Sequence, residues 1–400
     1  MNICYVTTVH VSKTRGGVER VTDTLASALA ERGHSVDLIS VQRPLEGDEV
    51  AGNQYFLPFS GRICCKENVE FLTEFFSRHR IDVLVNQSDI REVFDLIVAA
   101  HGAIPVVSVI HTDPAGILKG IEDQAEEWAY RNGVLKSLAY GPYLWLRKVY
   151  RFYSRRGYLR SKYRNYYEKS AAVVLLSARF KDSFCRIAGI QDRTRLHAIS
   201  NPLTYASSDY GDSAKEKIVL FVGRLSFNAK RLDRLLKIWR GIRSNGWKLY
   251  VLGDGPYRAF YEDLSRKWKL KDIEFKGNVD PLPYYRRAGI LCMTSTHEGF
   301  GMVITEALQN ELIPMAFGSY EAVHDIISSG TNGYVIRPFS TREYRRTLEQ
   351  LFADESLRNT LRNHIREDNE GLTRFSRETI TKKWEQLFQE VCAYSPVDGD

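Results

Sequence analysis

Short apolar runs alternate with amphipathic segments along the whole chain. The runs at 2–7, 104–110 and 289–294 have the length and composition of strands that are buried on both faces of a parallel sheet. Between such runs, apolar positions recur with helical spacing, for example in the segments that end near Arg32 and begin at Met302. This alternation predicts an α/β protein with doubly wound, parallel-sheet domains.

The chain is too long for one hydrophobic core. It has 400 residues, whereas single cores rarely grow beyond about 250–300 residues. A stretch rich in Ser, Gly and Asp breaks the pattern near the middle, as an interdomain segment does. We expect one domain over 1–203, a linker over 204–216, a second domain over 217–373 and a terminal helical segment over 374–400.

One segment joins two carboxylates to a glycine-rich turn. Glu298 precedes the turn 299–301, and Glu306 follows within the helix expected from Met302. Free N–H groups and the positive dipole end at a helix start favour a phosphate, and glycine lets the backbone approach it closely. Glu306 lies about five residues into the helix, roughly 7–8 Å along its axis, within reach of a ribose diol. The segment therefore predicts a nucleotide-sugar site.

This segment resembles the E-x7-E signature of retaining glycosyltransferases of the GT-B fold, and of glycosyltransferase family 4 in particular. Gly16 and Gly17 resemble the glycine loop of that family, which faces the acceptor and the donor phosphate. Arg224 and Lys230 match the two cations that clamp the leaving diphosphate. Alone, either cation is as readily a solvated loop residue, and the neighbouring Arg231 leaves the register of the lysine open by one.

Three further segments match the family in the same order. The turn at Gly253 follows a strand and lacks the G-x-G-x-x-G pattern of dinucleotide sites. The segment 275–279 resembles the part of the family that leads the chain past the nucleobase. His111 ends a strand at the sheet edge where ligands gather, and the family carries a histidine there near the donor sugar. The alternative is that His111 is a core or capping residue without a role at the donor sugar.

The resemblance implies a set of site residues. The expected catalytic residues are Glu298, His111, Arg224 and Lys230. The expected donor-binding residues are Gly16, Gly17, Gly223, Arg224, Lys230, Gly253, Gly277, Asn278, Val279, Glu298, Gly299, Phe300, Gly301, Met302, Val303 and Glu306. No metal or other cofactor is expected, because cations would stabilise the leaving group.

The resemblance also implies the architecture and the reaction. Two Rossmann-like domains would face each other across a cleft, the first binding the acceptor and the second the nucleotide sugar, with the terminal helix returning toward the first. A hexosyltransferase would move a sugar from a nucleotide diphosphate sugar, expected to be UDP-linked, to a saccharide acceptor, expected to be lipid-linked, in surface polysaccharide or glycan synthesis. The alternatives are a nucleotide-sugar epimerase or hydrolase, and a non-enzymatic nucleotide-sugar-binding protein.

The net charge of +7 has a local source, because the segment 131–167 holds many Lys and Arg residues and no acid. At 100° per residue, one helical face carries Trp145, Val149, Phe152, Leu159 and Tyr163. The neighbouring basic stripe consists of Arg147, Lys148, Arg151, Arg155 and Lys162. This pattern favours contact with an anionic membrane or a lipid-linked acceptor. The alternative is that this face packs inside the protein, with the helix interrupted at Gly157. Nucleic acid is not an expected partner.

The remaining features bear on location. No uninterrupted apolar run approaches the ~20 residues that cross a bilayer, and the start of the chain lacks the pattern of a signal peptide. The six cysteines show no metal-binding spacing. We therefore expect a cytoplasmic protein, located at the inner face of the membrane if the basic stripe binds lipid.

Overall fold

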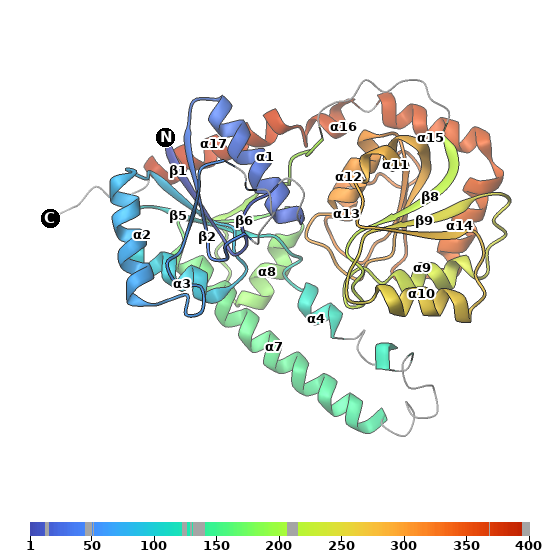
Figure 1. The fold of residues 1–400 in the computed structure, drawn as a ribbon, viewed down its shortest axis with the longest axis horizontal. Helices are drawn as coiled ribbons and strands as arrows, with labels where there is room; N and C mark the ends of the chain where they lie inside the picture. The colour runs from blue at the N-terminus through green and yellow to red at the C-terminus, as the bar shows by residue number, and fades with distance from the viewer. Residues whose placement is uncertain are drawn as a thin grey trace. The chain divides into compact units, whose positions relative to one another are not determined.

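The computed structural model describes residues 1–12, 16–44, 50, 52–121, 126–128, 130, 141–205, 215–367 and 369–393. By its contacts the chain forms two units (Figure 1). The first unit comprises Met1–Pro114, Gly157–Thr204 and Arg374–Asp400, and the second comprises Ala115–Arg156 and Tyr205–Thr373. The expected first domain, 1–203, thus includes a stretch that groups with the second unit. Most of the expected linker, residues 206–214, lies outside the described residues.

The first unit contains a seven-stranded sheet with the order β3-β2-β1-β4-β5-β6-β7, and every pairing in it is parallel. Its strands are β1 (Asn2–Thr7), β2 (Ser35–Ser40), β3 (Gln54–Phe56), β4 (Val83–Asn86), β5 (Val106–Ile110), β6 (Ala172–Leu175) and β7 (Leu196–Ala198). Its helices are α1 (Gly17–Glu31), α2 (Lys66–Arg78), α3 (Arg91–Ala100), α8 (Phe180–Ala188) and α17 (Arg377–Ala393). The predicted parallel α/β architecture is confirmed.

The terminal helix α17 packs against α1 within the first unit (Figure 1). Two ion pairs join α17 to the C-terminal end of α1: Arg377–Glu31 at 2.8 Å, and Arg32–Glu385 at 2.7 Å, where Arg32 directly follows α1. Trp384 of α17 is buried. The apolar side of α17 therefore completes the core of the unit that begins with β1.

The second unit contains a six-stranded parallel sheet with the order β10-β9-β8-β11-β12-β13. Its strands are β8 (Glu216–Val222), β9 (Lys248–Leu252), β10 (Ile273–Gly277), β11 (Ala288–Met293), β12 (Ile313–Phe317) and β13 (Tyr334–Ile336). Its helices are α4 (Gly116–Gly120), α9 (Leu232–Trp239), α10 (Arg258–Lys267), α11 (Leu282–Arg287), α12 (Met302–Gln309), α13 (Val323–Ile326), α14 (Thr341–Ala353), α15 (Glu355–Glu367) and α16 (Asn369–Thr373).

The strand order reverses once in each sheet. The reversal lies between β1 and β4 in the first unit and between β8 and β11 in the second. In open α/β sheets, ligands bind outside the carboxyl ends of the strands at this switch point. The segments that follow β8 and β11 contain Lys230 and Glu298, so the fold places both at the expected edge of the second sheet.

The helix α7 (Gly141–Lys169) is continuous over 29 residues, and Gly157 does not interrupt it. Leu159 and Tyr163 are buried in its C-terminal part, so the predicted lipid face is wrong there. The large apolar side chains that α7 exposes are Tyr143, Trp145, Leu146, Tyr150, Tyr153 and Tyr158. None of the helices in the described ranges combines the length and the apolar character needed to span a bilayer.

Lys162 does not belong to an exposed basic stripe, so that part of the prediction is wrong. Its side chain is 1% exposed and forms an ion pair with Asp89. Nζ also donates to the backbone carbonyl oxygen of Asp89 at 2.6 Å. A buried ammonium group requires such partners, so Lys162 anchors α7 within the first unit. Of the other four stripe residues, Arg147 and Arg155 are exposed, and Lys148 and Arg151 are partly exposed.

Candidate active site

Three glycines bring the backbone close together where β8, β9 and β10 end. Gly223, Gly253 and Gly277 have φ angles of +147°, +129° and +76°, which favour glycine. The amide of Gly253 donates to the carbonyl oxygen of Gly277 at 2.7 Å. A Cβ atom on Gly253 would lie 2.1 Å from the carbonyl oxygen of Gly223. The close backbone approach thus requires Gly253 whether or not a ligand binds.

Lys230 and Glu298 meet beside the adjacent carboxyl ends of β8 and β11. Nζ of Lys230 lies 2.7 Å from Oε1 of Glu298, and the two side chains are 20% and 15% exposed. Ser295 donates from Oγ to the same Oε1 at 2.6 Å. Within the described part of the chain, Oε2 of Glu298 forms no hydrogen bond. That oxygen is therefore left to accept a hydrogen bond from a ligand hydroxyl.

The cation at this position is Lys230 rather than the neighbouring Arg231. Arg231 is fully buried, has φ of +48° and directly precedes α9. Its guanidinium donates twice to Asp233, both at 2.9 Å, and pairs with Glu126 at 2.6 Å. These buried ion pairs give Arg231 a structural role.

The helix α12 begins at Met302, as predicted, behind Gly301 with φ of +96°. A Cβ atom at Gly301 would lie 2.6 Å from the hydroxyl oxygen of Tyr320, so the turn requires glycine. No side chain caps this helix start, which leaves its first N–H groups to solvent or to an anion. Phe300 is buried and anchors the turn. The partly exposed residues around it are Gly299, Met302 and Val303.

Glu306 lies within α12 and is 2% exposed. Its Oε2 accepts a hydrogen bond from the hydroxyl of Tyr285 at 2.8 Å. Asn310 donates from Nδ2 to the backbone carbonyl oxygen of Glu306 at 2.8 Å. Glu306 therefore has a structural partner, and its contact with a ribose stays a prediction. Tyr285 escaped the sequence analysis because no motif links it to Glu306.

Other predicted residues lie at the same sheet edge without joining the Lys230–Glu298 pair. Arg224 follows β8 and is exposed, and its guanidinium forms no ion pair with a described residue. Asn278 and Val279 are exposed after β10. Within the described ranges, no group of three or more His, Cys, Asp or Glu residues is placed to hold a metal ion.

The histidine predicted for the first unit lies at the carboxyl edge of its sheet. His111 follows β5, and its Nε2 is hydrogen-bonded to Oε1 of Gln87, which follows the adjacent β4. Burial lowers the pKa of His111 to about 4. The imidazole is therefore neutral at pH 7, with Nε2–H as the donor. Nδ1 is buried and has no hydrogen-bond partner within the described residues.

The predicted glycine loop of the first unit is described in part. Gly16 is the residue before α1, and Gly17 begins that helix. Both glycines are exposed, and no side chain caps the helix start. Residues 13–15 of the same loop lie outside the described part of the chain.

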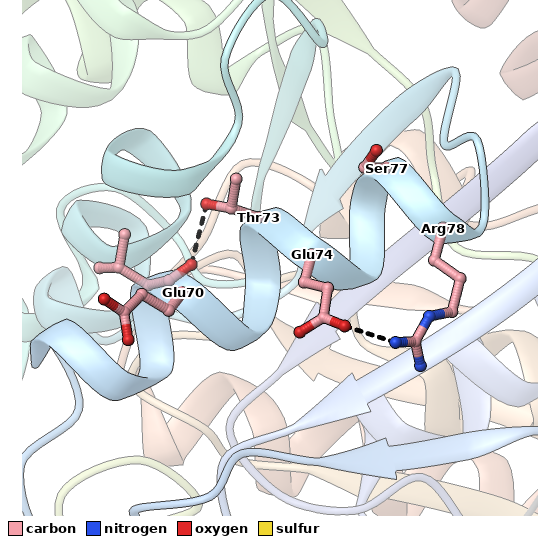
Figure 2. A pocket seen from close by; sticks show the side chains of 6 residues that line it. Glu70, Thr73, Glu74, Ser77 and Arg78 are labelled. Atoms are coloured by element: carbon pink, nitrogen blue, oxygen red, sulfur yellow. Dashed lines mark hydrogen bonds and ion pairs between the residues drawn. The ribbon is translucent and has the colours of Figure 1, made fainter.

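A hollow of about 500 Å³ runs along the outer surface of α2. Figure 2 shows that the labelled side chains around it all come from this helix, with Arg78 paired to Glu74. Thr73 donates to the carbonyl oxygen of Val69 at 2.9 Å. These polar groups are satisfied within the helix, and none of them was predicted for the site. The hollow is therefore not a candidate active site.

Two family models match this chain and together cover most of it. Residues 15–204 match the model described as Glycosyltransferase Family 4, and residues 207–368 match the model described as Glycosyl transferases group 1. Amylovoran biosynthesis glycosyltransferase AmsD of Erwinia amylovora is 34% identical over 177 residues, which are 43% of this chain and 48% of AmsD. The match thus spans about half the length of that relative.

A second relative has a name that specifies its acceptor. It is the Campylobacter jejuni GalNAc-alpha-(1->4)-GalNAc-alpha-(1->3)-diNAcBac-PP-undecaprenol alpha-1,4-N-acetyl-D-galactosaminyltransferase. This protein is 27% identical over 203 residues, which are 49% of this chain and 55% of the relative.

The fold matches solved glycosyltransferase structures over nearly the whole chain. A variant of Staphylococcus aureus TarM, in complex with fondaparinux, alpha-GlcNAc-glycerol and UDP, aligns with a TM-score of 0.73 and 14% identity. The alignment covers 97% of this chain and 100% of TarM. The predicted GT-B class is confirmed. The chain belongs to glycosyltransferase family 4, among the glycosyl transferases group 1.

Proposed function

We propose that this chain transfers a sugar from a UDP-sugar to a lipid-linked saccharide in polysaccharide or glycan synthesis, with retention of the anomeric configuration. The observation that carries the proposal is the Lys230–Glu298 pair, at 2.7 Å, at the switch point of the second sheet. The uncapped start of α12 follows Glu298 directly. In this proposal the cation of Lys230 and the amides at the start of α12 bind the diphosphate, and the carboxylate of Glu298 binds hydroxyl groups of the same ligand.

The main chemical task is to stabilise the leaving nucleotide. As the glycosidic bond breaks, negative charge grows on the phosphate oxygens. In this proposal Lys230, Arg224 and the first amides of α12 bind that charge in fixed positions. Removal of one such preorganised donor typically costs about 10²- to 10³-fold in rate. Because these groups supply positive charge, the proposal requires no metal ion.

The carboxylates and the histidine position the donor. Oε2 of Glu298 would accept a hydrogen bond from a sugar hydroxyl, because Oε1 is already bound to Lys230 and Ser295. Glu306 would bind the ribose hydroxyls. We propose that His111 also positions the donor sugar, as a neutral imidazole because its pKa is about 4.

The proposed mechanism retains the anomeric configuration of the sugar without a covalent nucleophile. In the proposed front-face displacement, the acceptor oxygen forms its bond to the anomeric carbon as the bond to the UDP oxygen breaks. The acceptor hydroxyl proton passes to the departing phosphate. UDP in the TarM structure supports the choice of nucleotide. The PP-undecaprenol portion of the Campylobacter protein's name supports a lipid-linked acceptor.

We further propose that the N-terminal half of α7 contacts an anionic membrane. Tyr143, Leu146, Tyr150 and Tyr153 recur at helical spacing and are 60–74% exposed. Arg147 and Arg155 are exposed in the same part of the helix, which has no acidic residue until Glu168. Exposed aromatics insert at a lipid interface, and each basic residue adds about 1 kcal/mol of attraction to an anionic surface.

A donor screen tests the transfer reaction. Nucleotide release would be measured for UDP-, GDP- and ADP-sugars, with and without undecaprenyl-diphosphate-linked saccharides, using Glu298→Gln as the inactive control. The proposal expects UDP release that depends on the acceptor and a product with the donor's anomeric configuration. A rate of UDP release that is the same with and without each acceptor would favour a hydrolase or an epimerase. Tight UDP binding without any turnover would favour a non-enzymatic binding protein.

A further inference from the structure

The three residues that follow β11 contact both members of the Lys230–Glu298 pair. Thr294, Ser295 and Thr296 are all buried. Each of them forms a hydrogen bond either to the Glu298 side chain or to a backbone carbonyl next to Lys230. The segment 294–296 therefore links the loop that contains the cation to the carboxylate that the cation binds.

Two of these hydrogen bonds hold the backbone on both sides of Lys230. The amide of Thr296 donates to the carbonyl oxygen of Ala229 at 2.8 Å. The hydroxyl of Thr294 donates from Oγ1 to the carbonyl oxygen of Arg231 at 3.0 Å. Because Lys230 lies between these two anchored residues, a shift of its Cα atom strains at least one of the two bonds. The side chain of Lys230 therefore starts from a fixed point of the backbone.

The hydroxyl of Ser295 restricts the orientation of the Glu298 carboxylate. It donates from Oγ to Oε1 at 2.6 Å, and Nζ of Lys230 donates to the same oxygen at 2.7 Å. Two donors from different residues limit the rotation of the carboxylate about the Cγ–Cδ bond more than one donor does. Oε2 then points in one direction, and a sugar hydroxyl that donates to it must occupy a defined position.

The backbone of Ser295 is held as well. The hydroxyl of Ser319 donates to the carbonyl oxygen of Ser295 at 2.7 Å. Ser319 follows β12, which pairs in parallel with β11 up to the residue before Thr294. Two neighbouring strands of the second sheet thus set the position of the Ser295 hydroxyl. Groups that are supported by such rigid elements keep a site in its productive geometry.

We propose that Thr294 and Ser295 are positioning residues for the transfer reaction. Thr294 places the ammonium group of Lys230 against the leaving diphosphate, and Ser295 directs Oε2 of Glu298 toward the donor sugar. Each of them acts through its partner. The inference rests on the proposed function, because that function assigns the ligand of each member of the pair. Displacement of a positioned group by about 1 Å can cost about 10²-fold in rate, so the two hydroxyls affect catalysis from behind the site.

Removal of each hydroxyl should affect a different quantity. Thr294→Val should lower kcat by about tenfold or more, because the cation for the leaving nucleotide loses its fixed position. Ser295→Ala should raise the KM for the UDP-sugar by about tenfold and change the Kd of UDP, which has no sugar, by less than about twofold. Steady-state nucleotide release with the best UDP-sugar of the donor screen measures kcat and KM. Calorimetry measures the Kd of UDP.

Two control variants separate positioning from an effect on the fold. Thr381→Val removes a buried hydroxyl in α17 that donates to the carbonyl oxygen of Arg377 at 2.7 Å, and it should keep the wild-type kcat and KM. Thr294→Ser loses only the methyl group and keeps the hydroxyl, so it should recover most of the kcat that Thr294→Val loses. If the methyl group of Thr294 mattered only for packing, Thr294→Ser would not recover it.

Crystal structures of the wild type and of Ser295→Ala test the geometry without a substrate. We expect the Glu298 carboxylate to change its orientation in the variant. The inference is overturned if that orientation is unchanged, if Ser295→Ala weakens UDP and the UDP-sugar equally, or if Thr294→Val keeps kcat within about twofold of the wild-type value. A wild-type chain that neither binds UDP nor releases it from any UDP-sugar would contradict the proposed function instead. The two crystal structures would then still show whether Ser295 orients Glu298.

Discussion

The ammonium group of Lys230 is held by a carboxylate. Its partner Glu298 is itself bound by Ser295, so both predicted residues have an internal structural contact. A diphosphate that binds here must share the ammonium group with Glu298. The carboxylate then fixes the position of the cation before the negative charge develops, which is the preorganisation that electrostatic catalysis requires.

Lys230→Met should lower kcat by about 10²- to 10³-fold, because it removes one fixed donor to the leaving phosphate. Steady-state nucleotide release measures the effect. The matched control is Lys217→Met, an exposed lysine at the opposite end of β8, which should keep wild-type activity. If kcat of the Lys230→Met enzyme stayed within about twofold of the wild-type value, Lys230 would not be a group that stabilises the leaving nucleotide.

Glu306→Gln should weaken UDP binding by about tenfold, because the ribose loses a hydrogen bond to a charged acceptor. The amide oxygen can still accept from Tyr285, so the midpoint of thermal unfolding should change little. Tyr285→Phe removes the same internal hydrogen bond and keeps the carboxylate. If calorimetry showed that both variants lose the same affinity for UDP, Glu306 would support the fold through Tyr285 and would not bind the ribose directly.

His111 should stay neutral down to about pH 4, since burial holds its pKa there. In the unfolded chain a histidine titrates near pH 6.5. The unfolded state therefore takes up this proton first, and the free energy of unfolding should fall as the pH drops from about 6.5 to about 4. Nitrogen NMR of the imidazole checks this, with Nε2 expected to carry the proton. A titration of His111 near pH 6.5 would contradict the account.

At the scale of elements, motifs that are tied to strand ends were predictable, and packing partners were not. A buried strand that is followed by glycines and a helix marks the carboxyl edge of its sheet. The start of α12 and the position of Lys230 at that edge could therefore be predicted from the local sequence. Helical periodicity separates the faces of α7, but it cannot tell which face the core covers. Lys162 therefore looked exposed, although Asp89 binds it in the first unit.

The exposed stripe of α7 should control membrane binding. Tyr150→Ser combined with Tyr153→Ser removes two aromatic side chains that are 74% and 67% exposed, so folding should be unaffected. Cosedimentation with vesicles rich in anionic lipid should fall by about tenfold, because each aromatic contributes apolar burial at the interface. The control is Phe59→Ser, which removes an aromatic that is 51% exposed elsewhere. Equal vesicle binding by the double variant and wild type would exclude α7 as the contact.

At the scale of the whole molecule, pairs of residues distant in sequence escaped prediction. Gln87 joins His111 because β4 and β5 are neighbours in the first sheet. Tyr285 reaches Glu306 only once the second unit has folded. The chain also enters the second unit between Ala115 and Arg156 and returns to the first before its sheet is complete. Such contacts depend on the strand order of each sheet, which the local pattern does not contain.

The central claim is that the second unit binds a pyrophosphate where β8 and β11 end. A crystal structure of the chain with UDP tests it most directly. We predict that the diphosphate lies at the start of α12, within hydrogen-bond distance of Lys230, with the ribose against Glu306. A structure with UDP bound elsewhere, and with the Lys230–Glu298 pair untouched, would contradict the account.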